Sequence, residues 1–323
     1  MAPAAKRQGE GRACGQGLPD HGPPDHTAGM PCFSNRFRVV MAAALWLVST
    51  GCLLGGAKPS AAPLDLTVAT FNLRFASDKR PNSWPERRPV MRACLQELDA
   101  DLFGTQEGLY GQLKDIAADA PEYEWIGLGR DGGSRGEFAA IFYRKARLEP
   151  VEFDHYWLSD TPNLIASADW GNTNRRMTTW VRFRDRATGR EFVVINTHLD
   201  HARVPAREKG AALIRERAGV LPKDLPVVLL GDFNATPNRG EKTYGILTGD
   251  GVFTDVWRSA PTLTNGDIET FHDFKGPKKG TFRIDWILTR GPWEAREAGV
   301  VVFAQGGQFP SDHHPVRARL RLP

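Results

Sequence analysis

The sequence predicts an α/β fold in which two packed β-sheets carry a few helices on their outer faces. Many short segments either alternate apolar and polar residues or are almost wholly apolar, as strands do. Only two longer segments repeat apolar residues at the spacing of a helix. Acidic, amide and imidazole side chains follow the strand-like segments, at the places where loops carry functional groups.

From residue 66 onward the chain shows no repeat and no low-complexity linker, so we expect residues 64–323 to form one domain. Residues 226–230 are almost wholly apolar and suit a central strand. Residues 316–322 alternate apolar side chains with arginines and suit a strand with one wet face. The expected strands are residues 66–73, 102–106, 123–129, 137–143, 148–157, 177–184, 191–197, 226–230, 283–288, 299–303 and 316–322.

Two helices are expected. Ser83 followed by Pro85 and Glu86 is a start signal for the first, in which Cys94 lies on the apolar face. Residues 205–221 are amphipathic and form the second. Cys94 is the only cysteine of the expected domain, so the domain cannot contain an internal disulfide and must be held by its core.

The first part of the chain is typical of an export signal. Arg36 and Arg38 precede an uncharged apolar run at residues 39–54, the pattern of a secretory signal peptide. This run of about 16 residues is shorter than the roughly 20 that a membrane-spanning helix needs. Because the signal begins well at Met30, we expect residues 1–29 to be an over-extended start or a disordered leader.

Residues 30–63 are expected to form the signal and a short linker, and two modes of processing stay open. Residues 49–52 are similar to a bacterial lipoprotein cleavage box, in which Cys52 would be lipidated and would anchor the domain to a membrane. Cleavage near Ala57 or Ala62 by an ordinary signal peptidase is the alternative. Both predict a periplasmic or extracellular protein.

The charge of the expected domain is almost balanced. Residues 64–323 carry 36 Lys and Arg against 35 Asp and Glu, a difference of +1, so most of the +4 of the whole chain belongs to the leader. A general nucleic-acid binder usually has a strongly basic face, and this composition gives no support for one.

Six segments share one design, in which an apolar strand ends or begins at acidic, amide or imidazole side chains. Each alone is typical of a turn, but six of them in one domain indicate a common site. Phosphoester cleavage needs a hard cation and groups that stabilise charge on phosphate oxygens, and carboxylate and amide oxygens suit Mg²⁺ or Mn²⁺. The segments are residues 70–74, 104–107, 196–200, 231–237, 283–287 and 311–315.

In this order and spacing, the six segments resemble the endonuclease/exonuclease/phosphatase superfamily over about residues 66–322. The superfamily includes deoxyribonucleases, abasic-site endonucleases, sphingomyelinases, inositol polyphosphate 5-phosphatases and deadenylases. The resemblance implies a four-layer α/β sandwich, with two central, mostly antiparallel β-sheets flanked by helices. It also implies a metal-dependent hydrolase that acts on phosphoester bonds.

Catalytic roles follow from the resemblance, residue by residue. His313 resembles the general base or phosphate-binding imidazole, and Asp285 the carboxylate that orients it. Asp232 would position or deprotonate the attacking water, and Asn234 would donate a hydrogen bond to a phosphate oxygen. His198 matches an imidazole that stabilises the phosphate or helps the leaving group.

The resemblance also implies a metal site for Mg²⁺ or Mn²⁺. Glu107 resembles the principal ligand, Asn72 lies beside it and Asp312 assists. Arg74 stands where abasic-site endonucleases have an acidic residue, so this strand is not expected to supply a second carboxylate.

Three further residues are candidates for substrate binding. Arg175 and Arg176 could clamp a phosphate through bidentate donors, with a solvated basic pair as the alternative. His272 lies in a segment that resembles exported members of the superfamily, and it is expected either to line the cleft or to be a turn residue.

The expected function is an exported phosphodiesterase or phosphatase that uses an Asp–His pair and a metal-bound phosphate. A small molecule or a lipid head group is favoured as substrate over long DNA, because the domain is nearly neutral. The first alternative is a secreted scavenging nuclease acting on DNA or RNA, and the second is a catalytically inactive binding module. We expect the protein to be a monomer.

Overall fold

The computed structural model describes residues 62–237 and 242–323. The expected leader at residues 1–29 and the signal segment up to residue 61, with Cys52, lie outside the described residues. None of the helices in the described part of the chain has the length and apolarity of a membrane span.

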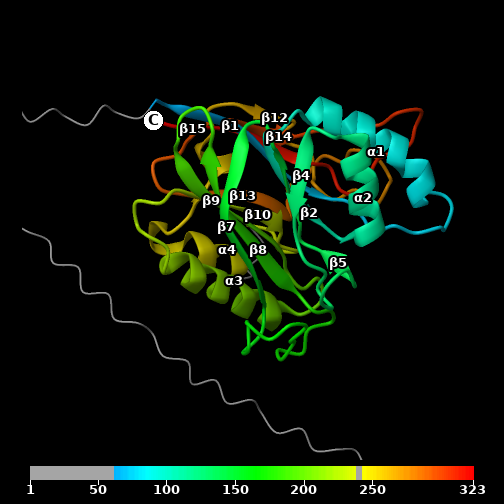
Figure 1. Cartoon of the computed structure of the whole chain (residues 1–323). Coiled ribbons are helices and arrows are strands. Elements are labelled where there is room, and N and C mark those ends of the chain that lie inside the picture. The colour runs from blue at the N-terminus through cyan, green and yellow to red at the C-terminus, as the bar shows by residue number, and fades with distance from the viewer. Residues whose placement is uncertain (1–61, 238–241) are drawn as a thin grey trace, which may run out of the picture. The chain divides into compact units, whose positions relative to one another are not determined.

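The first sheet has seven strands in the order β12-β14-β15-β1-β2-β6-β4 (Figure 1). Its neighbouring strands are antiparallel, except that β1 runs parallel to β2 and β12 runs parallel to β14. The strands are β1 (Leu64–Asn72), β2 (Leu102–Gln106), β4 (Tyr123–Ile126), β6 (Ile141–Arg144), β12 (Leu263–Thr264), β14 (Glu294–Val300) and β15 (Val316–Leu322).

The second sheet has six strands in the order β11-β13-β10-β9-β8-β7. Only β9 and β10 are parallel neighbours in it. Its strands are β7 (Leu148–Trp157), β8 (Met177–Asp185), β9 (Glu191–His198), β10 (Val227–Asp232), β11 (Thr254–Asp255) and β13 (Asp285–Arg290). A separate two-stranded ribbon pairs β3 (Gly108–Leu109) with β5 (Glu137–Phe138).

The two predicted helices are present. Helix α1 (Trp84–Leu98) begins after Ser83, whose backbone N–H donates to the Glu86 carboxylate at 3.0 Å, the reciprocal bond of a capping box. Helix α3 (Val204–Gly219) corresponds to the second prediction. The prediction missed three short helices and a 3₁₀ turn, each of 10 residues or fewer: α2 (Tyr110–Asp119), α4 (Lys242–Thr248), α5 (Val256–Ser259) and η1 (Gly249–Gly251).

Four layers result from how the apolar side chains are divided. One core cluster lies between the two sheets and contains Val68, Val194 and Leu230. A second lies between the seven-stranded sheet and helices α1 and α2, and it includes the buried Cys94. A third cluster packs helices α3 and α4 against the six-stranded sheet. In Figure 1, α3 and α4 lie on one side of the strands, and α1 and α2 lie on another. The predicted four-layer α/β sandwich is confirmed.

One predicted strand is misplaced. The apolar run at residues 299–303 suggested a strand there, but β14 ends at Val300 and residues 301–303 belong to no strand. The strand instead begins at Glu294, because its less apolar half, residues 294–297, pairs with residues 319–321 of β15. The predicted strand at residues 137–143 is divided between β5 and β6, which pair with different partners.

Candidate active site

The strand ends bring the predicted residues together. Asn72 ends β1 and Glu107 directly follows β2, and because these strands are parallel their carboxyl ends lie side by side. In the other sheet His198 lies opposite Asp232, which in turn lies opposite Asp285. The Asn72 side chain donates to Asp232 Oδ2 at 3.0 Å and so links the two sheets at the site.

These side chains line or underlie a cleft of about 420 Å³. Asn72 and Asp285 do not line it, but each is hydrogen-bonded to a residue that does. The predicted residues that line the cleft are Glu107, Arg176, His198, Asp232, Asn234, Asp312 and His313.

Asp285 and His313 form a buried pair. Oδ2 of Asp285 lies 3.0 Å from Nδ1 of His313. Burial by itself would lower the pKa of His313, but the carboxylates of Asp285, Asp232 and Asp312 outweigh it and raise that pKa to about 10. The imidazole is therefore protonated at neutral pH, and its Nε2 lies 3.9 Å from Asp232.

Asp232 occupies the centre of the site. Its Oδ1 accepts a hydrogen bond from the Asn234 backbone N–H at 2.9 Å, and its Oδ2 lies 3.5 Å from His198 Nε2. Burial and the charge of Asp285 raise the pKa of Asp232 above its usual range. A carboxylate that is buried, held in place and more basic than usual suits proton transfer near neutral pH.

Glu107 and Asp312 lie where a cation can be held between them. The Arg74 guanidinium is 3.8 Å from Glu107 and 3.7 Å from Asp312, so both carboxylates are within reach of one positive group. Asn72 donates to Glu107 Oε1 at 3.1 Å, and the Phe75 backbone N–H approaches Oε2 at 3.3 Å. Hard oxygen donors in this arrangement fit a divalent cation such as Mg²⁺ or Mn²⁺.

A second set of possible metal ligands shares the site. One ligand atom from each of Asp232, Asp285 and His313 lies within 4.8 Å of the others. Among the described residues, Oδ1 of Asp285 is buried and has no hydrogen-bond partner, so this oxygen could accept a hydrogen bond or bind a cation. A protonated His313 cannot bind a cation, and Asp285 is already paired with it. Glu107 and Asp312 are therefore the better ligands for an ion.

Four residues that line the cleft have a left-handed backbone, and all of them except Asp273 lie just after a strand. In the three that follow strands, Arg74, Glu107 and Asn234, the φ angles are 51°, 62° and 49°. Residues other than glycine adopt this conformation at a cost of about 1 kcal/mol or more, and such residues gather at functional sites. The sharp turns at the strand ends therefore aim these side chains into the cleft.

Arg176 lines the cleft but points its donors at two imidazoles. Its Nη1 lies 2.8 Å from His198 Nδ1, and its Nη2 lies 3.3 Å from His201 Nδ1. Burial and the charge of Arg176 lower the pKa of His198 well below its usual range, which keeps this imidazole neutral.

Arg175 and His272, the other two predicted substrate-binding residues, do not line the cleft. The Arg175 guanidinium is half exposed and bonds Asp131 at 3.0 Å and the Ala166 carbonyl at 2.8 Å. His272 is buried against His314, with ring centroids 3.9 Å apart. The structure therefore places both side chains outside the cleft lining, with Arg175 paired to Asp131 and His272 packed against His314.

Several residues that line the cleft were not predicted as site residues from the sequence. Arg74 and Ile284 lie within the six polar segments, but neither was given a role at the site. Glu137 was predicted only as the first residue of a strand. The additional lining residues are Arg74, Phe75, Glu137, Asn174, His201, Phe271, Asp273, Phe282 and Ile284.

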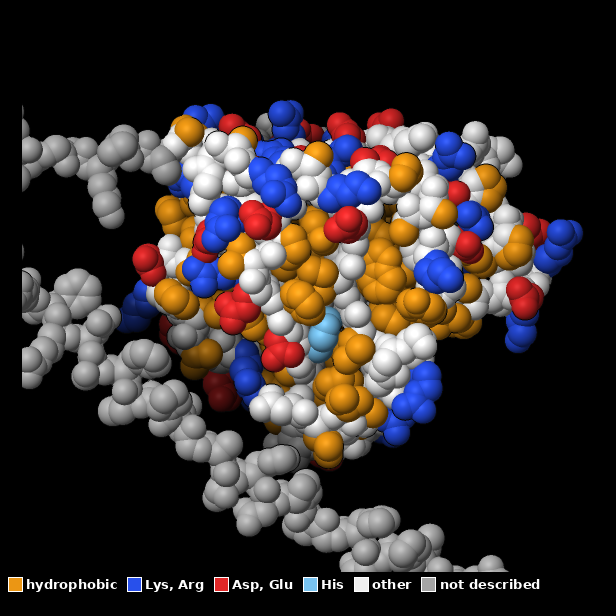
Figure 2. Space-filling view, viewed as in Figure 1, with side chains coloured by type: hydrophobic (Ala, Val, Ile, Leu, Met, Phe, Trp, Pro, Cys, Tyr) orange, Lys and Arg blue, Asp and Glu red, His pale blue; other side chains and the backbone are white. Residues whose placement is uncertain are grey.

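The surface charge is mixed. On the face that Figure 2 shows, Lys and Arg side chains alternate with Asp and Glu around a largely apolar middle. The basic loop near the site is neutralised as well, since Lys275, Lys278 and Lys279 each pair with an acidic residue. On this face and in this loop, the charges do not form the basic stripe typical of nucleic-acid binding.

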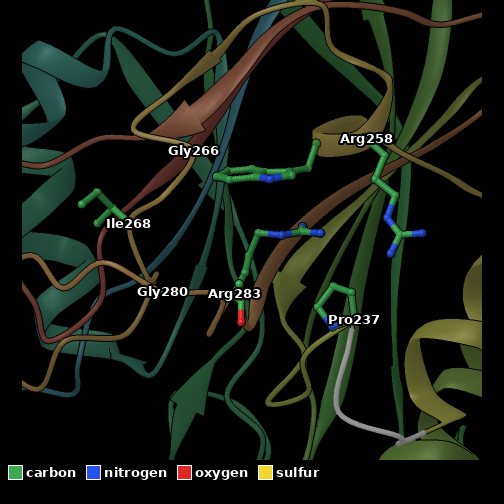
Figure 3. Close-up of a pocket in the computed structure, with 8 residues that line it drawn as sticks. Pro237, Arg258, Gly266, Ile268, Gly280 and Arg283 are labelled. Carbon is green, nitrogen blue, oxygen red and sulfur yellow. The ribbon is translucent and has the colours of Figure 1, made fainter.

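A smaller pocket of about 140 Å³ lies apart from the cleft and shares no residue with it (Figure 3). Arg283 in this pocket bonds Asp255 at 2.6 Å and lies 5.0 Å from the centre of the Trp257 ring. Because the Arg283 guanidinium is already paired with Asp255, it is not available to bind a substrate anion. We therefore place the active site in the larger cleft.

Comparison with known proteins gives consistent results. Residues 69–313 match the family model described as Endonuclease/Exonuclease/phosphatase family. A crystal structure of an endonuclease/exonuclease/phosphatase family protein from Bacteroides thetaiotaomicron is 35% identical with a TM-score of 0.77, covering 82% of this chain and 97% of that one. The structure of a mannosyl-6-phosphatase from the same species is also 35% identical, with a TM-score of 0.74, and covers 79% and 99%.

A curated relative is Nocturnin of Drosophila melanogaster, which is 33% identical over 165 residues. The match includes 48% of this chain but spans only 23% of Nocturnin, about a quarter of that protein's length.

Proposed function

Because the chain belongs to the endonuclease/exonuclease/phosphatase family of phosphoester hydrolases, we propose that it is a phosphatase that releases inorganic phosphate from small sugar phosphates. One observation carries the choice of substrate. The similarity to a mannosyl-6-phosphatase extends over 99% of that chain at 35% identity.

The cleft supports a substrate of this size. Its volume of about 420 Å³ is in the range of small-ligand pockets, roughly 300–1,000 Å³. Phe271, Phe282 and Ile284 line it near His313 and offer an apolar wall, against which the nonpolar face of a sugar can pack. The carboxylates and imidazoles described above supply the polar groups that would face the phosphate.

The proposed reaction uses the residues at the centre of the site. Asp232 accepts a proton from the attacking water while the water oxygen bonds to phosphorus and the bond to the sugar oxygen breaks. Protonated His313 donates its Nε2 proton to the departing sugar oxygen. Asp232 Oδ2 lies 3.9 Å from His313 Nε2, so the proton can return to the imidazole after release of the products. Asn234 and His198 donate hydrogen bonds to phosphate oxygens.

We propose that Glu107 and Asp312 hold a Mg²⁺ or Mn²⁺ ion, and that Asn72, whose side-chain N–H donates to Glu107 Oε1, keeps that carboxylate in place rather than binding the ion itself. Such an ion, when bound, supplies positive charge that offsets the charge on the phosphate oxygens. The convergence of two carboxylates on the Arg74 guanidinium supports a cation site at this position.

The alternative is a nuclease acting on DNA or RNA. The similarity to Nocturnin keeps it open, although it covers only part of either protein. The near balance of charge in residues 64–323 argues against it, because phosphate contacts along a nucleic-acid chain need clustered Lys and Arg.

An assay of phosphate release separates the two. The purified chain is incubated with Mg²⁺ and either mannose 6-phosphate, glucose 6-phosphate, single-stranded DNA or RNA. We expect inorganic phosphate from the hexose phosphates and little salt dependence. Cleavage of DNA or RNA that falls steeply with salt, without release of phosphate from sugars, would contradict the proposal.

We also propose that the enzyme is exported to the periplasm or the extracellular space. The basic segment and apolar run before residue 55 support this, with lipidation of Cys52 or ordinary cleavage as the two routes. Mass spectrometry of the mature protein from cell fractions tests it. An N-terminus upstream of residue 30 in the cytoplasmic fraction would contradict export.

A further inference from the structure

The contact between Arg176 and His198 determines where the imidazole carries its proton. Arg176 Nη1 lies 2.8 Å from His198 Nδ1, with both side chains buried. A guanidinium has five N–H donors and no acceptor, so Nδ1 must accept this hydrogen bond and carries no proton itself. The ring proton is then on Nε2, which lies 3.5 Å from Asp232 Oδ2.

We propose that Arg176 is a positioning residue that fixes His198 as a neutral imidazole with its proton on Nε2, so that His198 always offers one hydrogen-bond donor to the phosphate. The identity of the acceptor rests on the proposed function. The tautomer does not, because it follows from the contact alone.

Arg176 is poorly placed to bind phosphate itself. Its side chain is only 4% exposed, and its two Nη atoms face His198 and His201. Glu137 lies 3.8 Å from Nη1 and also bonds Arg130 at 2.6 Å, so the guanidinium is held between an anion and two imidazoles. A bidentate phosphate clamp would require Arg176 to give up these contacts.

The two imidazoles of the cleft are thus set in opposite states. His313 has a carboxylate behind its Nδ1 and is protonated. His198 has a guanidinium behind its Nδ1 and is neutral. One ring can donate a proton to the leaving group, while the other binds the phosphate through a donor that it keeps throughout the reaction.

Imidazole ¹⁵N NMR of the full chain tests the tautomer directly, in metal-free buffer and without substrate. His198→Gln identifies the signals of His198. We expect an unprotonated Nδ1 and a protonated Nε2 in the wild type and also in Arg175→Met, because Arg175 bonds Asp131 rather than His198. Arg176→Met should show a mixture of the two tautomers. A proton on Nδ1 of wild-type His198, or an unchanged tautomer in Arg176→Met, would overturn the proposal.

A double-mutant cycle tests whether Arg176 acts through His198. Arg176→Met should lower kcat for a hexose phosphate about 10- to 100-fold and change KM by less than about threefold, as losing the support of a site residue does. In a His198→Ala background the same substitution should have no further effect. An equal loss in both backgrounds would show that Arg176 binds phosphate itself and would refute the proposal.

Two features keep the outcome interpretable. If Arg176→Met fails to fold, Arg176→Lys takes its place in the NMR experiment. It retains a cation at this position and should preserve most of the wild-type tautomer. If the wild type hydrolyses no sugar phosphate, the proposed function fails, whereas the NMR result still decides the role of Arg176.

Discussion

Asp285 holds His313 through a single short contact, 3.0 Å from Oδ2 to Nδ1, and the pair is buried. The contact should make the metal-free protein sensitive to alkaline pH. The pKa of His313 is raised to about 10, above the value of about 6.5 in an unfolded chain. The stabilisation is therefore fully present below pH about 6.5 and is lost as the pH rises through about 10. Asp285→Asn should lower the melting temperature at pH 7 by several degrees, and the difference from the wild type should shrink towards pH 10.

Circular dichroism melts in a chelating buffer between pH 6 and 10.5 measure this difference. His313→Gln provides the matched control, because it removes the titrating group itself and should show the same pH dependence as Asp285→Asn. A constant difference between wild type and Asp285→Asn across this range would show that the pair does not titrate as proposed. In the loaded enzyme, Asp285→Asn should lower kcat by roughly 10²- to 10⁴-fold.

Arg74 should compete with a divalent cation. Its guanidinium lies 3.8 Å from Glu107 and 3.7 Å from Asp312, so a metal that binds these carboxylates meets a like charge. The arginine side chain is 42% exposed, which limits the effect to about 1 kcal/mol. Arg74→Ala should therefore tighten Mg²⁺ binding about fivefold, measured by calorimetry without substrate.

Arg296→Ala is the control for that measurement, because Arg296 is exposed and pairs with Glu294 on β14, away from the cleft. It should leave the affinity for Mg²⁺ unchanged. Weaker Mg²⁺ binding in Arg74→Ala would mean that Arg74 helps to build the site rather than compete for it.

Features of the site that follow from local sequence patterns could be predicted, whereas contacts between residues far apart in the sequence could not. The strand-end motifs predicted that Asn72 lies beside Glu107 and that His198 lies beside Asp232, because parallel strands bring their carboxyl ends to one edge. The position of Arg176 was not predictable. Whether its guanidinium meets phosphate or an imidazole depends on a contact across 22 residues that no local pattern encodes.

The same limit applied to His272 and to β14. His272 stood in a polar segment, yet stacking on His314 turns it into the protein interior. Residues 301–303 are apolar, yet strand pairing in the sheet ends at Val300, opposite Val316. Alternation and motif spacing describe single segments, whereas these outcomes depend on which segments meet.

Arg87 should be essential for stability although it touches no predicted site residue. Its guanidinium is fully buried and donates to five backbone carbonyls on segments flanking the cleft. Arg87→Met removes all five of these hydrogen bonds, and only the carbonyls of Leu73 and Arg74 also accept one from Gln112, so the free energy of unfolding should fall by about 3 kcal/mol or more. The acceptors are the carbonyls of Leu73, Arg74, Phe75, Asn82 and Pro310.

The neighbouring Arg88 is the control, because it lies on the same helix and forms exposed ion pairs with Asp115 and Asp119. Arg88→Met should cost at most about 1 kcal/mol. Urea unfolding followed by fluorescence measures both variants. Equal losses would indicate that the carbonyls around Arg87 find other donors.

Gly104 on β2 should be required for the two sheets to pack. A Cβ at this position would overlap Leu230 Cδ1 and would lie 2.7 Å from Asn196 Cγ on the facing sheet. Gly104→Ala should lower the free energy of unfolding by about 1–3 kcal/mol, the usual cost of overpacking. Gly111→Ala in α2, where nothing lies within 4 Å of the added carbon, should be neutral or slightly stabilising.

The contact with Leu230 can be separated from the contact with Asn196 by a compensating substitution. Leu230→Val removes one carbon from the crowded side, so the double variant Gly104→Ala/Leu230→Val should be more stable than the sum of the two single losses predicts. Asn196 donates to the carbonyls of Thr105 and Ala140 and cannot move without breaking those bonds. If the two losses in the free energy of unfolding simply add, the clash is with Asn196 and not with Leu230. The hydrogen-bonded Asn196 then sets the distance between the two sheets beneath the cleft.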